Sequence, residues 1–485
     1  MSRSNMTVGQ AGPETGSELW RWSAGELASA IRAGAVSAEA AVEAHLRRID
    51  AVNPRVNAVT TVLADHARAA ARAADAAVGA GRSLGPLHGV PFTVKDNIDV
   101  AGSPSTWGLR VRAHAVPALD APVVARLKEA GAIPLARTNM PDMGMRWHTD
   151  NDLHGRTLHP WDPSRTPGGS SGGEAVAIAT GMSPLGLGND YGGSVRLPAY
   201  ACGIVGLRPT FGSVPSARSL EPVDAPPTLQ LFAVEGVLAR RVADLELAFA
   251  LLCAGDRRDP WWMPVRRPAD GDSVSVRVAV VADPGDLGVH DDVRRSVERA
   301  AAALADAGYE VEQAEPPEVV LATELWRDLT AAELRPSFAQ LAPELSAGAL
   351  EYQRQNLSRI PVLDLEGYLE RFTRRHAVQR AWSRFLDRYP LVLGPVSTAP
   401  MAPVGYDLGG PDHAQELLWR HRLLVSVNLL GLPSLAVPTG VAGGLPQGVQ
   451  LIGDRYREDL CLGAGKAIEA ACPMPTPIEP APAQA

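Results

Sequence analysis

Residues 166–198 are TPGGSSGGEAVAIATGMSPLGLGNDYGGSVRLP, a stretch with two serines that each lie among glycines. Ser170 and Ser194 are 24 positions apart, on either side of a helix-like run at 174–180. Glycine beside a reactive serine permits the tight backbone that presents the hydroxyl, and it leaves amide N–H groups open to a developing oxyanion. The candidate donors are the backbone amides of Tyr191, Gly192, Gly193 and Ser194. The alternative is that both clusters are only tight turns.

A nucleophilic serine needs a base, and none of the eleven histidines lies in these clusters. Residues 168–172 (GGSSG) formally match the G-x-S-x-G nucleophile elbow, but a run so rich in glycine and serine produces that match easily. Lys95 is the stronger candidate, because it ends the apolar run 90–94. To act as a base it needs a pKa lowered by burial from about 10.4 to about 7–8. The alternative is an ion pair with Asp96, although adjacent side chains in a strand point to opposite faces.

The two serine clusters and the Lys95 strand resemble the amidase signature family. The agreement extends to six further segments: 86–91 (PLHGVP), 137–141 (RTNMP), 160–167 (PWDPSRTP), 202–210 (CGIVGLRPT), 431–434 (GLPS) and 448–453 (GVQLIG). The resemblance covers most of the chain and is weakest between about Pro264 and Arg388. Several motifs in the same order and spacing make it far more specific than a single short match.

The resemblance implies a Ser–cis-Ser–Lys triad. Ser194 would be the nucleophile, Lys95 the base, and Ser170, preceded by a cis peptide bond from Gly169, the proton relay between them. The oxyanion hole would consist of the amides of Tyr191, Gly192, Gly193 and Ser194. Three positions would support the site by hydrogen bonding, unless they only make ordinary loop contacts: Ser171, Asp190 and Arg196. Three others would line the substrate: Met143, Gly144 and Tyr191. Neither a metal nor a cofactor is implied.

Three positions depart from the usual family pattern. His159 stands where Asn is common, Asn189 where Thr is usual, and Tyr191 where Ile or Thr is usual. None of these changes removes a triad atom, and we expect the Tyr191 ring to narrow or line the acyl pocket. Three tryptophans are further candidates for an aromatic or apolar acyl site, with ordinary packing as the favoured alternative: Trp147, Trp261 and Trp262.

The implied function is hydrolysis of a small carboxamide to a carboxylic acid plus ammonia or an amine, through an acyl-enzyme on Ser194. One alternative is the amidotransferase component that releases ammonia from glutamine and works with partner subunits. The other is a catalytically silent scaffold of the same fold. The fold does not select the amide substrate, and both a monomer and a homodimer remain open.

Composition excludes several other classes of protein. The net charge of −8 and the lack of a long basic run leave no electrostatic footprint for nucleic acid. Four widely spaced cysteines and the absence of C-x-x-C or H-E-x-x-H spacing argue against disulfides and zinc, so we expect a cytoplasmic protein. The longest uncharged run, 423–453, is broken by prolines and glycines, which predicts buried strands and loops and no membrane span.

The pattern along the chain predicts an α/β fold, because apolar strands alternate with amphipathic helices. We expect a single large domain with a central mixed β-sheet covered by helices on both faces, the amidase signature fold. The domain is predicted to span 19–472, with its core motif at 86–213 and a helical cap at about 321–388. Flexible tails are predicted at 1–18 and 473–485.

Overall fold

The protein was analysed as a computed structural model, which describes residues 15–221, 223–264 and 276–482. The strands in these residues are β1 (Val59–Val62), β2 (Pro91–Lys95), β3 (Ile133–Thr138), β4 (Leu185–Asp190), β5 (Val205–Arg208), β6 (Val234–Ala239), β7 (Arg277–Val280), β8 (Glu310–Gln313), β9 (Leu391–Pro395), β10 (Ser434–Ala442) and β11 (Leu445–Gly453). They form one sheet in the order β1-β3-β2-β4-β6-β5-β10-β11-β9-β7-β8.

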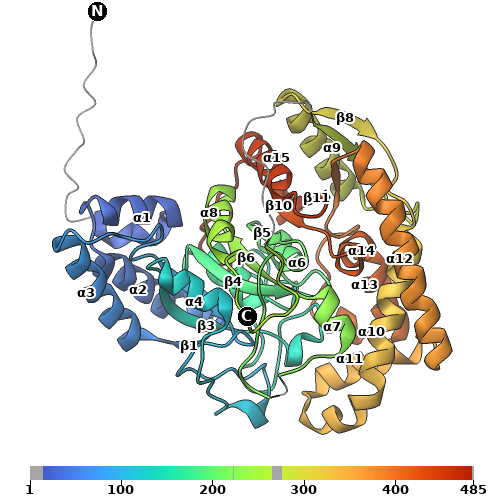
Figure 1. The fold of residues 1–485 in the computed structure, drawn as a ribbon, viewed down its shortest axis with the longest axis horizontal. Coiled ribbons are helices and arrows are strands. Elements are labelled where there is room, and N and C mark those ends of the chain that lie inside the picture. Colours follow the sequence, from blue (N-terminus) through green and yellow to red (C-terminus); the bar gives the residue numbers. More distant parts are fainter. Residues whose placement is uncertain (1–14, 222, 265–275, 483–485) are drawn as a thin grey trace, which may run out of the picture.

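Helices flank this sheet (Figure 1). They are α1 (Ala24–Arg32), α2 (Ala38–Val56), α3 (Ala64–Gly79), α4 (Pro122–Glu129), α5 (Gly172–Ala179), α6 (Arg196–Cys202), α7 (Pro227–Phe232), α8 (Val242–Leu252), α9 (Asp291–Asp306), α10 (Val319–Leu341), α11 (Ala347–Ser358), α12 (Leu365–Arg388), α13 (Pro411–Arg420), α14 (Arg422–Leu430) and α15 (Glu458–Ala471). Short 3₁₀ helices lie at Thr15–Arg21, Arg110–Arg112, Asp142–Gly144, Ala342–Glu344 and Tyr406–Leu408.

The sheet is mixed, as predicted. Strand β2 is parallel to both β3 and β4, whereas the strands from β4 through β6, β5, β10 and β11 to β9 are antiparallel to their neighbours. The edge at β9, β7 and β8 is parallel again. Lys95 is the last residue of β2, and Asp190 is the last residue of the neighbouring β4. Because the two strands are parallel, both residues lie at the same edge of the sheet.

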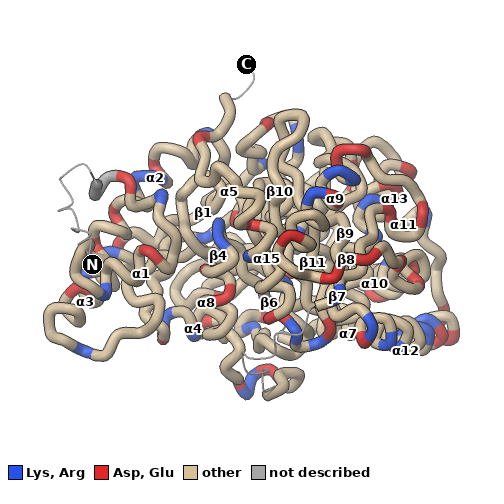
Figure 2. Tube along the Cα trace, turned by 90° about the horizontal axis from the view of Figure 1, so that it is seen from above, with Lys and Arg blue, Asp and Glu red and all other residues tan. Residues whose placement is uncertain are grey.

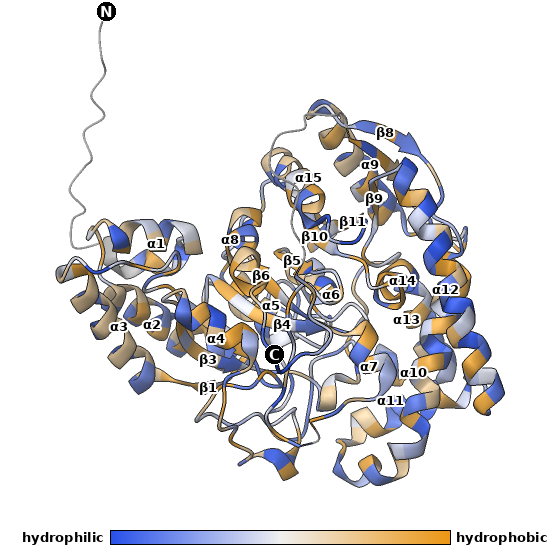
Figure 3. Cartoon of the chain, viewed as in Figure 1, coloured by the Kyte–Doolittle hydropathy of each residue, from blue (hydrophilic) through white to orange (hydrophobic). Residues whose placement is uncertain are grey.

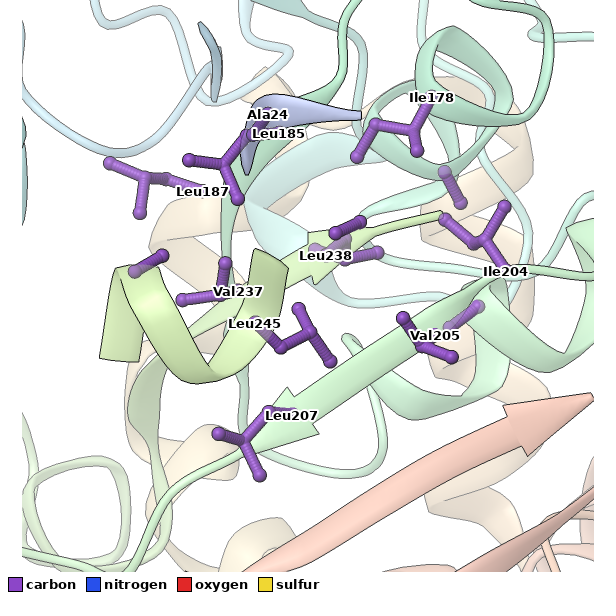
Figure 4. Close-up of a cluster of buried hydrophobic side chains, with 14 of the residues drawn as sticks. Ala24, Ile178, Leu185, Leu187, Ile204, Val205, Leu207, Val237, Leu238 and Leu245 are labelled. Carbon is purple, nitrogen blue, oxygen red and sulfur yellow. The ribbon is translucent and has the colours of Figure 1, made fainter. Parts of the chain in front are cut away.

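The core lies around the central strands, which carry many buried apolar side chains. Figure 4 shows Leu185 and Leu187 of β4 beside Val237 and Leu238 of β6, with Leu245 of α8 against them. Burial of each such side chain contributes roughly 1.5–3 kcal/mol. Helix α5 lies wholly inside the protein, with every residue buried. Its small residues allow this close packing: a Cβ at Gly173 would lie 2.4 Å from the Asn139 nitrogen.

The segment expected to be a helical cap forms α10, α11 and α12. Helix α10 packs against α14 and α12, and α12 lies at the outer edge of this layer (Figure 1). Only Val378, Trp382 and Leu386 of α12 are buried, and Figure 3 shows many hydrophilic residues on this helix. Its outer face is therefore solvent-facing, and its apolar stripe joins the core made with α10 and α14.

The C-terminal segment corrects one prediction. Its low-complexity composition predicted a flexible tail from residue 473, but residues 473–482 dock on the domain. Ile478 N–H donates to Ala179 O at 2.9 Å, and Arg48 pairs with Glu479 at 2.6 Å. Backbone and charged groups that find partners on α2 and α5 thus fix this segment. The predicted N-terminal tail at 1–18 lies mostly outside the described residues.

The uncharged run 423–453 gives the two buried strands β10 and β11, as predicted, but its first part is helix α14 rather than a strand or loop. Every residue of α14 is buried, so its sequence has no polar face by which a helix could be recognised. None of the helices in the described residues is long and apolar enough to cross a membrane.

Candidate active site

Lys95 is fully buried at the end of β2, and its Nζ donates two hydrogen bonds. One goes to Ser170 Oγ at 2.7 Å and the other to Asn189 Oδ1 at 2.7 Å. Burial lowers the pKa of Lys95 to about 7, although the carboxyl groups of Glu235, Asp190 and Glu174 oppose this change. A lysine with such a pKa is neutral in a large fraction of molecules near pH 7, as a general base must be.

Asp96 does not neutralise Lys95. Its carboxylate accepts a hydrogen bond from Thr106 Oγ1 and lies in the field of Arg137. The expectation that Lys95 and Asp96 need not meet holds, although Asp96 follows the end of β2 and does not belong to the strand. Besides Ser170, the Lys95 Nζ bonds to Asn189, one of the three departures from the family pattern. Asn189 Nδ2 in turn donates to Asn97 Oδ1 at 3.0 Å, which orients the amide oxygen toward Lys95.

The peptide bond between Gly169 and Ser170 is cis. A Cβ at Gly169 would lie 2.7 Å from Arg146 O, so this position has room for glycine alone. The next residue, Ser171, donates its N–H to Ser194 O at 3.2 Å. The two glycine-flanked serine clusters are therefore joined directly, although α5 and β4 separate them in the sequence.

Asp190 anchors the segment 190–194, which we call the Ser194 loop. Its carboxylate accepts from Gly193 N–H at 2.8 Å, from Arg196 Nη2 at 3.0 Å and from Asn428 Nδ2 at 2.8 Å. Burial alone would raise the pKa of Asp190, but Arg196, Arg208 and Asn428 hold that pKa well below its usual range. The predicted supporting role of Asp190 and Arg196 thus has a physical basis, because together they fix the backbone around Ser194.

The oxyanion-hole prediction needs one correction. The N–H of Gly193 donates to Asp190, so it is not open to a substrate oxygen. For the N–H groups of Tyr191, Gly192 and Ser194, the described part of the chain provides no acceptor. The Asp190 carboxylate thus accepts from Gly193 N–H, and the N–H groups of Tyr191, Gly192 and Ser194 are the candidate donors to an oxyanion. Ser171, predicted as a supporting residue, has a buried hydroxyl without a hydrogen-bond partner in the described residues, while its N–H makes the bond to Ser194.

A cavity of about 260 Å³ opens beside the Ser194 loop. Ser194 lines it, and a Cβ at Gly144, another lining residue, would lie 3.1 Å from Ser170 Oγ. The predicted substrate-lining residues all border it: Met143, Gly144 and Tyr191. Other aromatic and sulfur-containing side chains on its wall are Trp107, Met145, Trp147, Trp326 and Tyr352. A cavity lined in this way suits a flat apolar group next to the nucleophile.

Trp261 and Trp262, the other two tryptophans considered for the cavity wall, lie elsewhere. Trp262 donates its indole N–H to Cys253 O at 3.1 Å, and Trp261 packs near Phe211 with 45% of its surface exposed. Of the three predicted wall residues, only Trp147 lines the cavity. His159 accepts hydrogen bonds from Trp161 N–H at 3.1 Å and Asp162 N–H at 3.2 Å, so it closes a turn away from the site. Within the described ranges, no group of three or more His, Cys, Asp or Glu is arranged to hold a metal ion.

Sequence reasoning missed Trp326, which lies on α10 where the resemblance is weakest. It also missed Asn428 and Gln450, which hydrogen-bond to Asp190 and Arg196 from more than 200 residues away. No local spacing marks such partners, although Gln450 lies in one of the segments that carried the resemblance.

Comparison with known proteins agrees with this geometry. The family model described as Amidase matches residues 40–462. The chain belongs to the amidase family. The indoleacetamide hydrolase of Bradyrhizobium diazoefficiens is 40% identical to this amidase over 93% of this chain and 86% of the relative. A glutamyl-tRNA(Gln) amidotransferase component from Acidothermus cellulolyticus is 32% identical over 94% of this chain and 95% of the relative.

Among solved structures, 6-aminohexanoate cyclic dimer hydrolase complexed with substrate matches this amidase with a TM-score of 0.80. The two are 27% identical, and the match covers 94% of this chain and 98% of the other. These relatives confirm the predicted α/β fold with its large mixed sheet. They also establish this amidase as an enzyme that hydrolyses amides, and they favour hydrolysis over the amidotransferase alternative.

Proposed function

We propose that this amidase hydrolyses a carboxamide with an aromatic acyl group through an acyl-enzyme on Ser194. The observation that carries the proposal is the contact between the buried Lys95 Nζ and Ser170 Oγ, together with the bond from Ser171 N–H to Ser194 O and the place of Ser194 on the cavity wall. A deprotonated lysine at this position can take a proton only through a hydroxyl relay. The triad implied by the sequence resemblance supplies that relay in Ser170.

In the proposed first step, Ser194 Oγ attacks the carbonyl carbon. The Ser194 proton moves to Ser170 Oγ while the Ser170 proton moves to Lys95 Nζ. The electron pair of the C=O bond moves to oxygen, and this oxyanion accepts hydrogen bonds from the open N–H groups of the Ser194 loop. Removal of a single such donor costs about 10²–10³ in rate in known enzymes.

The tetrahedral intermediate then breaks its C–N bond. The leaving nitrogen takes the proton back from Lys95 through Ser170 and departs as ammonia or an amine. Water repeats the sequence at the acyl-enzyme: it loses a proton along the same path, attacks the ester carbon and releases the carboxylic acid, and Ser194 recovers its proton. Lys95 thus acts first as base and then as acid, which a pKa of about 7 allows in both directions.

Two observations support an aromatic acyl group. The cavity next to Ser194 is lined by Trp107, Trp147 and Trp326, and the most similar relative named above is an indoleacetamide hydrolase. Most charged groups on the cavity wall have partners within the protein: Arg146 Nε with Asp407, Arg327 with Asp328, and Glu333 with Thr228 and Tyr368. The buried Nη1 of Arg146 has no hydrogen-bond partner in the described residues. A glutamine, with its charged amino and carboxylate groups, finds less complementarity there than an indole or phenyl ring.

The first test is reaction with a small sulfonyl fluoride, followed by intact-mass measurement and peptide mapping. We expect one adduct on Ser194, and we expect it to be lost in the Lys95→Ala variant. The second test compares indole-3-acetamide and phenylacetamide with glutamine, using the chain on its own. Hydrolysis of the aryl amides supports the proposal. An adduct on another serine, or activity confined to glutamine, contradicts it.

A further inference from the structure

All five carbonyl oxygens of the Ser194 loop accept hydrogen bonds. The donors differ along the loop: Arg208 and Asn428 bind Asp190 O, Trp326 Nε1 binds Tyr191 O at 3.1 Å, Trp147 Nε1 binds Gly192 O at 2.8 Å, Leu197 N–H binds Gly193 O at 2.8 Å, and Ser171 N–H binds Ser194 O at 3.2 Å. Two consecutive peptide groups are thus held by two indole rings from distant parts of the chain.

The indole bonds determine where the following N–H groups point. In a trans peptide, the C=O and the N–H of the next residue point in opposite directions, and the peptides within the Ser194 loop are trans. Trp326 therefore fixes the direction of Gly192 N–H through Tyr191 O. Trp147 fixes the direction of Gly193 N–H through Gly192 O in the same way.

The two peptide groups differ in what their N–H groups meet. In the Gly192–Gly193 peptide, Trp147 binds the carbonyl and Asp190 binds the N–H, so this peptide plane is fixed at both ends. In the Tyr191–Gly192 peptide, Trp326 binds the carbonyl, but the Gly192 N–H has no acceptor in the described residues. This peptide plane is therefore fixed at its carbonyl end alone. An accepting carbonyl also polarises its peptide and strengthens the N–H as a donor. The Tyr191–Gly192 peptide thus depends on Trp326 for both its direction and its donor strength.

Trp326 is packed tightly enough to act in this way. A Cβ at Gly192 would lie 2.7 Å from Cζ2 of Trp326, so the indole covers this side of the glycine. The Trp326 ring lies 5.9 Å from the Tyr191 ring and 6.3 Å from the Trp147 ring, centroid to centroid. Trp326 belongs to α10, and it also lines the cavity.

We propose that Trp326 is a positioning residue for the oxyanion hole: its indole N–H holds the Tyr191 carbonyl so that Gly192 N–H faces the oxyanion formed in the reaction. The inference rests on the proposed function. It assigns to α10 a part in the chemical step in addition to its place in the cavity wall, and it distinguishes Trp326 from Trp147 although both donate to the same loop.

The test is the Trp326→Phe variant, which removes the N–H and keeps an aromatic ring. The probes are phenylacetamide as substrate, phenylacetate as planar ligand, and phenylacetaldehyde, to which Ser194 Oγ adds to give a tetrahedral hemiacetal oxyanion. We expect kcat to fall by about 10- to 100-fold, less than the full loss of one donor. The inhibition constant of phenylacetaldehyde should rise by the same factor. The KM of phenylacetamide and the inhibition constant of phenylacetate should change by less than about threefold.

Two variants with the same chemical change are compared with it. Trp147→Phe removes the indole bond to Gly192 O and also alters the cavity wall, so it should change the KM of phenylacetamide. Its kcat should fall by a smaller factor than that of Trp326→Phe, because Asp190 still holds the Gly192–Gly193 peptide group. Trp262→Phe removes an indole bond to a carbonyl far from the site and should leave all four constants unchanged. Trp326→Tyr provides a second variant without the indole N–H if Trp326→Phe does not fold.

The inference is overturned if Trp326→Phe weakens phenylacetate and phenylacetaldehyde equally, since Trp326 then only shapes the cavity. It is also overturned if Trp147→Phe and Trp326→Phe lower kcat by the same factor. Failure of the proposed function gives a different result: the wild-type protein itself hydrolyses no aryl amide and forms no sulfonyl adduct on Ser194, and the inference then falls with it.

Discussion

The residues around Lys95 and the residues that wall the cavity from α10 and α11 are organised in opposite ways. Around Lys95 the functional groups are polar, buried or half-buried, and bonded to one another on β2, β4, α6 and the segment before α5. The α10 and α11 side offers half-buried apolar side chains such as Leu334. It also carries exposed ion pairs, as between Arg359 and Asp412, and Figure 2 shows both acidic and basic residues along the neighbouring α12.

This difference suggests separate tasks: the polar network around Lys95 carries out the reaction, and the cavity wall selects the substrate. A buried polar network tolerates few changes, because each lost partner leaves another group unsatisfied. A wall of apolar side chains can change in size with little effect on the groups behind it. Apart from the part proposed for Trp326, the sheet side therefore fixes which bond is cut, and the helical side adjusts which molecule is cut. The following predictions test this division, in order of decreasing effect.

Replacement of Ser194 by alanine should abolish turnover. We expect kcat to fall by at least about 10⁴-fold, as when the nucleophile of other serine enzymes is removed. Steady-state hydrolysis of phenylacetamide measures the loss. Ser358→Ala, on the outer helix α11, is the control and should retain wild-type activity. Residual activity above about 1% in Ser194→Ala would place the nucleophile elsewhere.

The Asp190→Asn variant should damage both activity and stability. It leaves Arg196 and Arg208 without their buried carboxylate, and breaking such a pair costs about 3–5 kcal/mol. Urea unfolding measures this loss, and kcat should fall by more than about 10²-fold because the Ser194 loop loses its anchor.

The matched change on the helical side is Arg359→Ala, which breaks the exposed pair with Asp412. It should cost less than about 1 kcal/mol and leave kcat unchanged. Equal costs for Asp190→Asn and Arg359→Ala would contradict the division between the two sides.

The pH dependence of kcat/KM should reflect the protonation state of Lys95. The base must be neutral in the free enzyme, so kcat/KM should fall about tenfold per pH unit below a pKa of about 7 and level off above it. Asn189→Asp places a carboxylate at the amide that accepts from Lys95, which favours the charged lysine and should move this limb to higher pH. If the acidic side of the kcat/KM profile does not shift in Asn189→Asp, the titration of a group other than Lys95 determines it.

The free energy of unfolding should also depend on pH through the protonation of Lys95. The folded-state pKa of Lys95 is about 7 and the unfolded value is about 10.4, so the unfolded chain binds more protons between these two pH values. The contribution of Lys95 to stability is therefore most unfavourable below pH 7 and improves as the pH rises toward 10. Urea unfolding of Lys95→Met against wild type should show the largest stabilisation at pH 6 and almost none near pH 10. A difference independent of pH would contradict the lowered pKa.

The smallest effect is expected at Leu334, on the cavity wall. Leu334→Ala should raise the KM of phenylacetamide by about 3- to 10-fold, since removal of one or two methylene contacts is worth about 1–3 kcal/mol at most. Hydrolysis of acetamide, which lacks the ring that would contact Leu334, should be unaffected, as should kcat for phenylacetamide. A fall in kcat for both substrates would extend the chemical machinery into α10 beyond Trp326.

The same division explains what the sequence could predict. Lys95, Ser170 and Ser194 were found because their residue types and flanking glycines are tied to the reaction, and the mixed sheet followed from alternating strands and helices together with the family resemblance. The choice of donors in the Ser194 loop was not readable, because Gly193 is consumed by a carboxylate whose orientation depends on Arg196 and Asn428. Trp326 was missed because α10 has neither a family motif nor a local spacing that marks an indole directed at a distant carbonyl.

The docked segment at 473–482 has a consequence for the time course of folding. The bond between Arg48 and Glu479 joins positions 431 residues apart, and contacts that close such long loops form after local ones. The segment covers the end of α5, the helix that begins beside Ser170 and Ser171, through the bond from Ile478 to Ala179. A contact made late in folding is among the first to be lost when the protein unfolds. Changes at Glu479 should therefore leave the folding rate nearly constant and shorten the lifetime of the folded enzyme.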